Sequence, residues 1–417
     1  MQRISTGMPF DNSQFHIRQQ QSRISNLQNQ ITSQNRIQDL RDDPLAAARA
    51  VRYESFLTRL ERFEQNALYA RDHFNITHAY LDSALGLVQR VRELAVQGAN
   101  GTYAPDDLRL MAIEVNELLR ELVSVSNATG PDGNRLFAGD RAFTEPFRVV
   151  EGMVEGGRES VVLRVEYRGS GATRRTEISE GTFAELDIGG GEAFWAERMQ
   201  IFSSVDAANY RVNVPGSFFL NGIEIPVTVG DTLPSIAARI NDSPAPVRAS
   251  IDPSTRGLAL EGTGPGLIRA EDGAEGASVL RDLGIIRGNM ESGVTLWDET
   301  RSRVSGGSMF DMMIRLRDAM FRGDGEFIGS QGIGGMDMAL GNLTTRIAEI
   351  GSRQERVEAT WQRLNREIPD VQSYVARETG VNMATAATNL AMMDLAHRAS
   401  LQTTARLLPV TLLDFLR

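Results

Sequence analysis

The stretch LGNLTTRIAEIGSRQERVEATWQRLNREIPDVQSYV (340–375) decides the fold of this chain. Its apolar residues recur at alternating steps of three and four, which places them on one stripe of a helix and is typical of a coiled-coil seam. The stripe predicts one long helix that needs a partner along its apolar side, with a bend or a break at Pro369. The seam residues expected here are Leu343, Ile347, Ile350, Val357, Trp361 and Leu364.

Candidate partners for this seam lie in the first third of the chain. A helix predicted from Pro44 to about residue 97 carries an apolar or alanine residue at every seventh position, namely Leu60, Ala67, Phe74, Leu81, Val88 and Ala95. After the break GANGTYAPDD (98–107), a second helix is predicted with the same three-four spacing at Leu108, Met111, Val115, Leu118, Leu122 and Val125. Leu108, Val115 and Leu122 complete the predicted bundle seam. Distant parts of the chain are therefore expected to pack in one helical bundle.

The segment LRDDPLAAARAV (40–51) predicts an abrupt helix start. Asp43 can cap the helix, Pro44 suits its first position, and the two acids complement the positive end of the helix dipole. The alanines that follow favour helix and are small enough for a neighbour to approach closely. We interpret this segment as the boundary between a weak helix before it and a stable bundle after it.

The two ends of the chain carry weaker apolar stripes. Ile17, Ile24 and Ile31 repeat at seven, but Gln20 and Gln34 interrupt the stripe, and the stripe at the other end is short and contains His397. Isolated helices of this kind are marginal in water, so each is expected to fold when it docks on a partner. The expected assembly interface consists of Ile17, Ile24, Leu27, Ile31, Leu390, Met393, Leu401, Leu408 and Leu412.

The middle of the chain differs from both ends. Residues 141–300 hold more than half of the 39 glycines and of the 14 prolines, together with alternating runs such as SVVLRVEY (160–167) that are typical of strands. The expected fold is therefore α+β, an elongated coiled-coil bundle with an inserted β-rich head. The expected segments are 1–42 and 381–417 for the terminal assembly helices, disordered in the monomer, 43–140 and 301–380 for the bundle, and 141–300 for the head.

Composition excludes several kinds of chemistry. The chain has no cysteine, and all 44 basic residues are arginine, so thiolate metal ligands, cysteine nucleophiles and lysine-dependent catalysis are excluded. His73 and His78 are five positions apart, not the three or four that two metal ligands on one helix face require. The clusters GTGPG (262–266), GIGG (332–335) and GDGEF (323–327) are interpreted as turns. No catalytic, cofactor or metal site is expected.

The net charge and the hydropathy of the chain also restrict the classes of partner that it can have. A net charge of −10 argues against nucleic acid or an anionic membrane as a partner. No stretch approaches the 18 apolar residues that a spanning helix needs, and the first residues show no apolar run of signal-peptide length.

Four motifs carry a resemblance to a known family. ISTGM (4–8), LRDDPLAAARA (40–50), SNATGPDGNRLFAGD (126–140) and RASLQTTARLLPVTLLDFL (398–416) resemble bacterial flagellins, and within that family the members that join the flagellar hook to the filament. The resemblance covers roughly residues 1–140 and 300–417. Residues 216–262 resemble the flagellin IN motif, with a strand, an Asn-Gly turn, a strand, a helix and a hairpin around the turn at residues 253–257.

The resemblance implies a structural subunit of the extracellular bacterial flagellum, exported by the flagellar type III apparatus without a cleaved signal peptide. Its implied partners are the hook-side junction protein (hook-associated protein 1), flagellin, further copies of itself in a ring, and a cytoplasmic export chaperone that holds the C-terminal helix. No cofactor is implied.

Three alternatives stay open. A flagellin filament subunit shares most of these motifs, although flagellins usually have alanine where this chain has Pro44 and tend to end without the aromatic LLDFL close (412–416). A secreted coiled-coil effector or adhesin would bind a host molecule and would not depend on flagellar genes for export. An enzyme would require a deep pocket in the middle domain.

Overall fold

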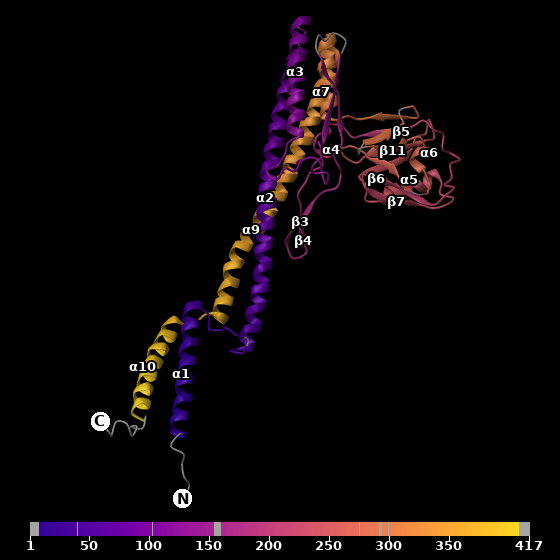
Figure 1. The fold of residues 1–417 in the computed structure, drawn as a ribbon. Coiled ribbons are helices and arrows are strands. Elements are labelled where there is room, and N and C mark those ends of the chain that lie inside the picture. Colours follow the sequence, from indigo (N-terminus) through magenta and orange to yellow (C-terminus); the bar gives the residue numbers. More distant parts are fainter. Residues whose placement is uncertain are drawn as a thin grey trace, which may run out of the picture. The chain divides into compact units, whose positions relative to one another are not determined.

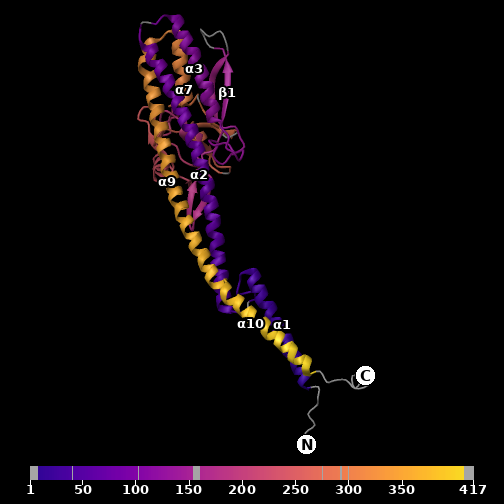
Figure 2. The same ribbon diagram turned by 90° about the vertical axis from the view of Figure 1, so that its left-hand side faces the viewer.

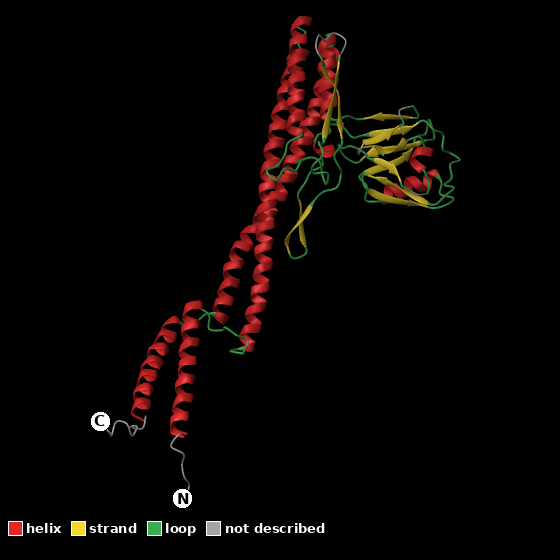
Figure 3. Cartoon of the chain, viewed as in Figure 1, coloured by secondary structure: helices red, strands yellow, loops and turns green. Residues whose placement is uncertain are grey.

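The computed structural model describes residues 8–39, 41–101, 103–153, 160–274, 276–291, 294–298 and 300–407. Two compact units are present, one formed by residues 1–65 and 361–417 and the other by residues 66–360. Helices α2 (Pro44–Ala99) and α9 (Ile333–Thr379) contribute to both units (Figure 1). Helices occupy both chain ends and strands occupy the middle (Figure 3), so the expected α+β class is confirmed.

The smaller unit contains the helix start that the sequence predicts. Helix α2 begins at Pro44, and Asp43 Oδ1 accepts the Ala46 N–H over 3.0 Å, which caps the helix and holds the pKa of Asp43 below its ordinary value. The alanines Ala46, Ala47 and Ala50 are buried. The expected cap and the expected close approach at the alanines are both confirmed.

Two connections of the chain lie side by side in this unit. Helix α1 (Met8–Ser33) ends at Gln34, which has a left-handed φ of 58°, and Gln34 O accepts the N–H of Val381 just before α10 (Met383–Leu407). The Arg36 N–H donates to Thr379 O over 2.6 Å. The Arg36 guanidinium contacts Asp43 over 3.3 Å. The segment before α2 is thus tied to the end of α9.

A small apolar core joins α2 and α9 in the same unit. Leu60 packs with Leu364, Ile368 and Val371, and aromatic residues of α2 cover this cluster. A bend or a break was expected at Pro369, and helix α9 continues through this residue without a break. Pro369 is exposed while its neighbours on the apolar stripe are buried. Pro369 therefore lies on the exposed side of the helix, where the loss of its N–H disturbs the packing of the apolar stripe least.

The larger unit contains a helical bundle made from both halves of the chain. Helices α3 (Pro105–Ser126) and α7 (Met309–Arg322) run beside the upper parts of α2 and α9 (Figure 2). Every predicted seventh-position residue of α2 is buried, and five of the six have no exposed surface. Leu108, Val115, Leu122, Leu343, Ile350, Val357 and Leu364 are also buried, whereas Ile347 and Trp361 are half-buried.

The buried face of α3 is rotated relative to the predicted stripe. Met111, Leu118 and Val125 are only half-buried, and Ala112, Leu119 and Ser126 are buried in their place. A straight helix has 3.6 residues per turn rather than 3.5, so its inner face drifts across a strict three-four pattern. Helix α7 packs directly on α3 and covers the additional positions.

The cluster GIGG (332–335) is not the turn that was predicted. Residues 328–332 form a π-helical turn, η1 (Ile328–Gly332), after the short α8 (Gly325–Phe327), and Ile333 begins α9. A Cβ on Gly332 would lie 2.8 Å from Leu316 Cδ1, and one on Gly335 would lie 3.0 Å from Met312 Sδ. The glycines are therefore needed because α7 packs closely against this part of the chain.

The β-rich part contains several small antiparallel sheets. A four-stranded sheet has the order β13 (Ser302–Ser305), β5 (Gln200–Ser203), β9 (Leu258–Gly262) and β8 (Val247–Ile251). A three-stranded sheet has the order β10 (Ala270–Asp272), β6 (Gly216–Leu220) and β7 (Ile223–Val227). The strand pairs are β1 (Phe147–Gly152) with β2 (Val161–Tyr167), β3 (Arg175–Ser179) with β4 (Thr182–Glu185), and β11 (Ile286–Glu291) with β12 (Val294–Trp297). Strand β13 lies beyond the predicted head range of 141–300.

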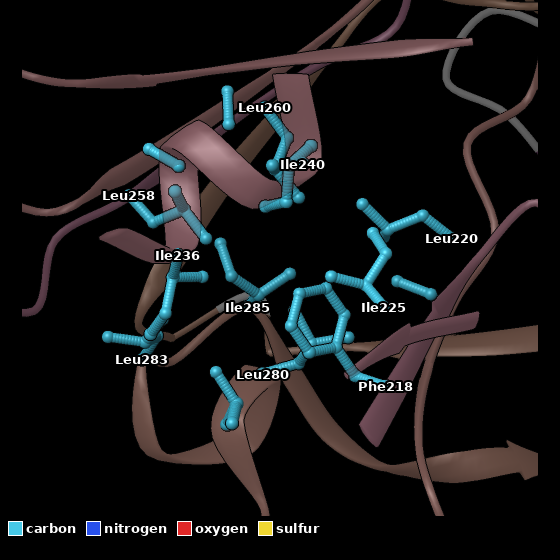
Figure 4. Close-up of a cluster of buried hydrophobic side chains, with 14 of the residues drawn as sticks. Phe218, Leu220, Ile225, Ile236, Ile240, Leu258, Leu260, Leu280, Leu283 and Ile285 are labelled. Atoms are coloured by element: carbon cyan, nitrogen blue, oxygen red, sulfur yellow. The ribbon is translucent and has the colours of Figure 1, made fainter. Parts of the chain in front are cut away.

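Residues 216–262 have the predicted order of elements. Strands β6 and β7 are joined by Asn221 and Gly222, whose φ values of 50° and 81° are both positive, as the favoured two-residue hairpin turn requires. Helix α5 (Leu233–Asp242) and the β8–β9 hairpin follow. Apolar residues from these elements, including Phe218, Ile236 and Leu260, form the core of the head with Leu280 and Leu283 at the short helix α6 (Val279–Asp282) (Figure 4). A further short helix, α4, spans Gly190–Ala193.

Candidate assembly interface

The terminal helices α1 and α10 pack against each other as an antiparallel pair (Figures 1 and 2). The C-terminal end of α1 and the N-terminal end of α10 meet at the hydrogen bond from Val381 N–H to Gln34 O, which is 3.0 Å long. Both helices therefore extend in the same direction away from this hydrogen bond. We call α1 and α10 the terminal pair.

The terminal pair buries very little apolar surface. Among its described side chains, no residue of α1 is buried, and Ala386 is the one buried residue of α10. The predicted interface residues Ile17, Ile24, Leu27, Ile31, Leu390 and Met393 are each half-buried. Leu401 is 46% exposed, and Leu408 and Leu412 lie outside the described residues. Six of the nine expected residues are thus half-buried, and Leu401 is exposed.

Polar groups interrupt the contact between the two helices. Gln20 Oε1 and His397 Nδ1 are shielded from solvent without a hydrogen-bond partner. Counting from the Gln34–Val381 contact, Gln20 is 14 residues along α1 and His397 is 16 residues along α10. With a rise of about 1.5 Å per residue, the two polar side chains lie at nearly the same level. Shielded polar groups without partners weaken the pairing.

Apolar side chains also remain on the outside of the terminal pair. Met392 is 58% exposed, Leu395 is 71% exposed, and Phe15 of α1 is 64% exposed. A groove of about 630 Å³ runs between the helices, and Leu27, Met392 and Met393 are among its lining residues. The terminal pair therefore presents apolar surface that the described residues do not cover.

Two buried polar networks in the larger unit were not predicted from the sequence. Arg317 of α7 has no exposed surface and donates to Asn116 Oδ1 over 2.9 Å and to Val162 O over 2.6 Å. A signal for it was present, because Arg317 occupies a place on the apolar stripe of MFDMMIRLRDAMFR (309–322) where a leucine would be expected. A charged residue on a buried stripe indicates a hydrogen-bonded network.

The second network surrounds Asp187, just after strand β4. Arg174 Nε and Nη2 donate to the Asp187 carboxylate over 2.9 and 2.8 Å, and His73 Nε2 of α2 lies 3.4 Å from Asp187 Oδ1. Burial acts to raise the pKa of Asp187, but the contacts with His73 and Arg174 outweigh it and lower the pKa. His73 is buried beside this carboxylate.

Side-chain amides and guanidinium groups fix the head to the helices. Asn342 Nδ2 of α9 donates to the carbonyls of Glu192, Ala193 and Trp195, over 2.8, 3.3 and 2.7 Å. The Arg353 guanidinium points to the carbonyls of Glu185 and Asp187. These hydrogen bonds connect residues 185–195 to helix α9 within the larger unit.

No described helix combines the length and the apolar character that crossing a membrane requires. Across the same described residues, no group of three or more acidic or histidine side chains is arranged to hold a metal ion.

Both ends of the chain match family models. The bacterial flagellin N-terminal helical region matches residues 4–142, and the bacterial flagellin C-terminal helical region matches residues 333–416. Together these regions cover slightly more than half of the chain. The chain belongs to the bacterial flagellin family, which confirms the family that the sequence motifs predicted.

Individual relatives carry more specific names. The chain is 26% identical over 164 residues to flagellar hook-associated protein 3 of Salmonella typhimurium, covering 39% of this chain and 52% of that protein. It is 25% identical over 219 residues to flagellar hook-associated protein 3 of Escherichia coli, covering 51% of this chain and 67% of that protein. The match thus spans about half the length of the Salmonella protein. The crystal structure of flagellar hook-associated protein 3 of Legionella pneumophila aligns with a TM-score of 0.46 at 17% identity, covering 78% of this chain and 97% of that one.

Proposed function

We propose that this chain is a structural subunit of the bacterial flagellum that connects hook and filament and assembles through its terminal pair. The family match and the hook-associated names of its relatives support a flagellar role. The structure contributes the observation that carries the proposal: helices α1 and α10 bury only Ala386 among their described side chains.

The energetics of the terminal pair support folding on assembly. Ordering each backbone residue costs about 1–2 kcal/mol, whereas a fully buried large apolar side chain contributes only about 1.5–3 kcal/mol. Helices α1 and α10 contain 26 and 25 residues, and their apolar contacts are half-buried. The pair therefore needs further burial to be stable, and neighbouring subunits would supply it.

The partners follow from this position in the flagellum. The subunit contacts the hook-side junction protein on one side and flagellin on the other, and further copies of itself complete a ring. Before export, a cytoplasmic chaperone covers the apolar side chains of α10, including Met392 and Leu395, which are exposed in the free chain. Export proceeds through the flagellar type III apparatus to the outside of the cell.

The main alternative is a filament subunit, because flagellin shares both family regions. The number of copies separates the two functions. A filament subunit would be the dominant protein of a purified flagellar preparation, whereas a junction subunit would be a minor one.

A double variant tests the role of the terminal pair. Met392→Asp with Leu395→Asp places two charges on the exposed apolar surface of α10, while Val214→Asp with Val229→Asp places the same charges on exposed head positions. We expect the α10 variant to keep the circular dichroism of the folded bundle but to leave cells without attached filaments. The head variant should support normal filaments. Normal attachment with the α10 variant would contradict the proposal.

A further inference from the structure

A pocket of about 490 Å³ lies in the head. Its walls are the loop after strand β2, the Asn-Gly turn between β6 and β7, and the start of β10. Cavities of this size are typical of small-molecule sites. The lining residues that matter for its chemistry are Arg141, Ser170, Thr173, Phe219, Asn221 and Arg269.

Two of these residues are arginines without an acidic partner. Among the described residues, Arg141 and Arg269 donate to backbone carbonyls, and neither forms an ion pair with a carboxylate. The Arg269 guanidinium lies 5.0 Å from the ring centre of Tyr167 and donates to Gly169 O. Arg141 Nη1 donates to Arg168 O over 3.4 Å.

The electrostatics of Arg269 indicate an incompletely compensated charge. Burial lowers the pKa of the Arg269 guanidinium from its ordinary value, and the charge of Arg141 lowers it further. Tyr167 and Asp140 oppose this effect but do not cancel it. An anion bound between the two guanidinium groups would supply the missing compensation.

The backbone holds both walls of the pocket in place. Asn221 Oδ1 accepts the Arg269 N–H over 2.6 Å, and the Asn221 N–H donates to Arg269 O over 2.9 Å. On the opposite wall, Gly139 has a φ of 65°, and a Cβ there would lie 2.7 Å from the carbonyl oxygens of Ser170 and Ala172. The arginines are therefore presented by fixed backbone, and little ordering is needed for a ligand to bind.

We propose that this pocket binds a small hydroxylated organic acid, of the size of citrate. A guanidinium group pairs with a carboxylate through two parallel hydrogen bonds, which makes the two free arginines a fitting site for a polycarboxylate. Phe219 and Ile223 provide an apolar wall for the carbon skeleton. Glu271 also lines the pocket and can accept a hydrogen bond from a ligand hydroxyl.

The volume of the pocket and its other charged residues restrict the class of ligand further. A single phosphate or acetate ion would leave most of the 490 Å³ unfilled. Arg175 at the rim is already paired with Glu185 over 2.8 Å, so the binding charge comes from Arg141 and Arg269. This site does not depend on the proposed role in flagellar assembly.

Calorimetric titration of the full chain with citrate tests the site, with inorganic phosphate as the small-anion probe. We expect one citrate to bind saturably per chain at low ionic strength. Phosphate should bind at least about tenfold more weakly than citrate. Arg141→Gln is the primary variant, because Arg141 is exposed and its replacement leaves the fold intact. It should weaken citrate binding by about tenfold, the loss of one charge-assisted pair. Arg269→Gln should weaken it at least as much.

A matched variant controls for the general loss of positive charge. Arg248→Gln removes an exposed arginine from strand β8, outside the pocket, and should change citrate affinity by less than about twofold. The proposal is overturned if citrate does not bind saturably, if phosphate binds as tightly as citrate, or if Arg248→Gln weakens binding as much as Arg141→Gln.

Discussion

Arg317 of α7 donates a 2.9 Å hydrogen bond to Asn116 Oδ1 of α3, and the two residues are 201 positions apart in the chain. The same Asn116 oxygen accepts the N–H of Val162 in strand β2 over 3.3 Å. One amide therefore connects the N-terminal half of the bundle, the C-terminal half and the first hairpin of the head. Both halves of the chain thus contribute helices to the bundle. The buried hydrogen bonds of Asn116 fix how α3, α7 and β2 pack together.

Replacing the buried guanidinium should destabilise the larger unit. Arg317→Met keeps the length of the side chain but leaves Asn116 Oδ1 and Val162 O without this donor, so we expect a loss of about 3 kcal/mol in the free energy of unfolding. Arg315→Met on the exposed side of the same helix is the matched control and should change stability by less than about 0.5 kcal/mol. Urea denaturation followed by circular dichroism measures both. Equal midpoints for the two variants would show that the network contributes no stability.

The bundle seam should be sensitive to truncation according to burial. Ile350 has no exposed surface, so Ile350→Ala removes buried methylene groups and should cost about 2–5 kcal/mol. Met338 on the same helix is 45% exposed, and Met338→Ala should cost less than about 1 kcal/mol. Chemical denaturation of the full chain gives both values. A cost for Met338→Ala as large as that for Ile350→Ala would contradict the assigned helix orientation.

The Asp187 network predicts a pH dependence with a definite sign. Because the folded state lowers the pKa of Asp187 below its unfolded value, its contribution to stability is present above that value and is lost as the pH falls through the folded pKa. Asp187→Asn should therefore lower the free energy of unfolding by about 3 kcal/mol at pH 7. The difference between the two proteins should stay constant above about pH 5 and shrink below it.

An exposed carboxylate provides the control for this pH series. Asp82 lies on the same helix as His73 and is exposed, so Asp82→Asn should leave the stability profile close to that of the unmodified chain. Urea midpoints measured from pH 7 to pH 3 compare the three proteins. A gap between Asp187→Asn and the unmodified chain that widens on acidification would refute the assigned role of Asp187.

The terminal pair should exchange its amide hydrogens quickly in the free subunit. Its apolar residues are half-buried, and two shielded polar groups lack partners, so opening costs little free energy. Hydrogen exchange followed by mass spectrometry should show exchange of α1 and α10 within seconds. The part of α2 around Phe74 and Leu81, which have no exposed surface, should resist exchange for far longer. Equal protection of both regions would rule out folding coupled to assembly.

Much of the bundle could be predicted because its signals are local. Asp43 and Pro44 mark the helix start by capping chemistry alone, and the residues every seventh position from Leu60 to Ala95 are all buried. Asn221 and Gly222 likewise predicted their hairpin, because few residues tolerate two successive positive φ angles.

The remaining features depend on contacts between distant segments. The sequence around Gly332 and Gly335 predicts a turn when it is considered alone. The close approach of α7 explains why these glycines lie in π-helical and α-helical structure. Pro369 reads as a helix break, but its exposed side of α9 tolerates it. The partners of Arg317 and His73 come from elements that no local pattern connects. The assembly interface at the two chain ends stays a prediction, and Leu401 is exposed in the free chain.

Immunogold labelling of intact flagella tests the central claim most directly, because it locates the subunit in the structure that it is proposed to build. An antibody raised against the head should give a single band where the hook meets the filament, and the band should disappear in cells that carry Met392→Asp with Leu395→Asp. Label distributed along the whole filament, or absent from the flagellum, would contradict the proposed position at the junction.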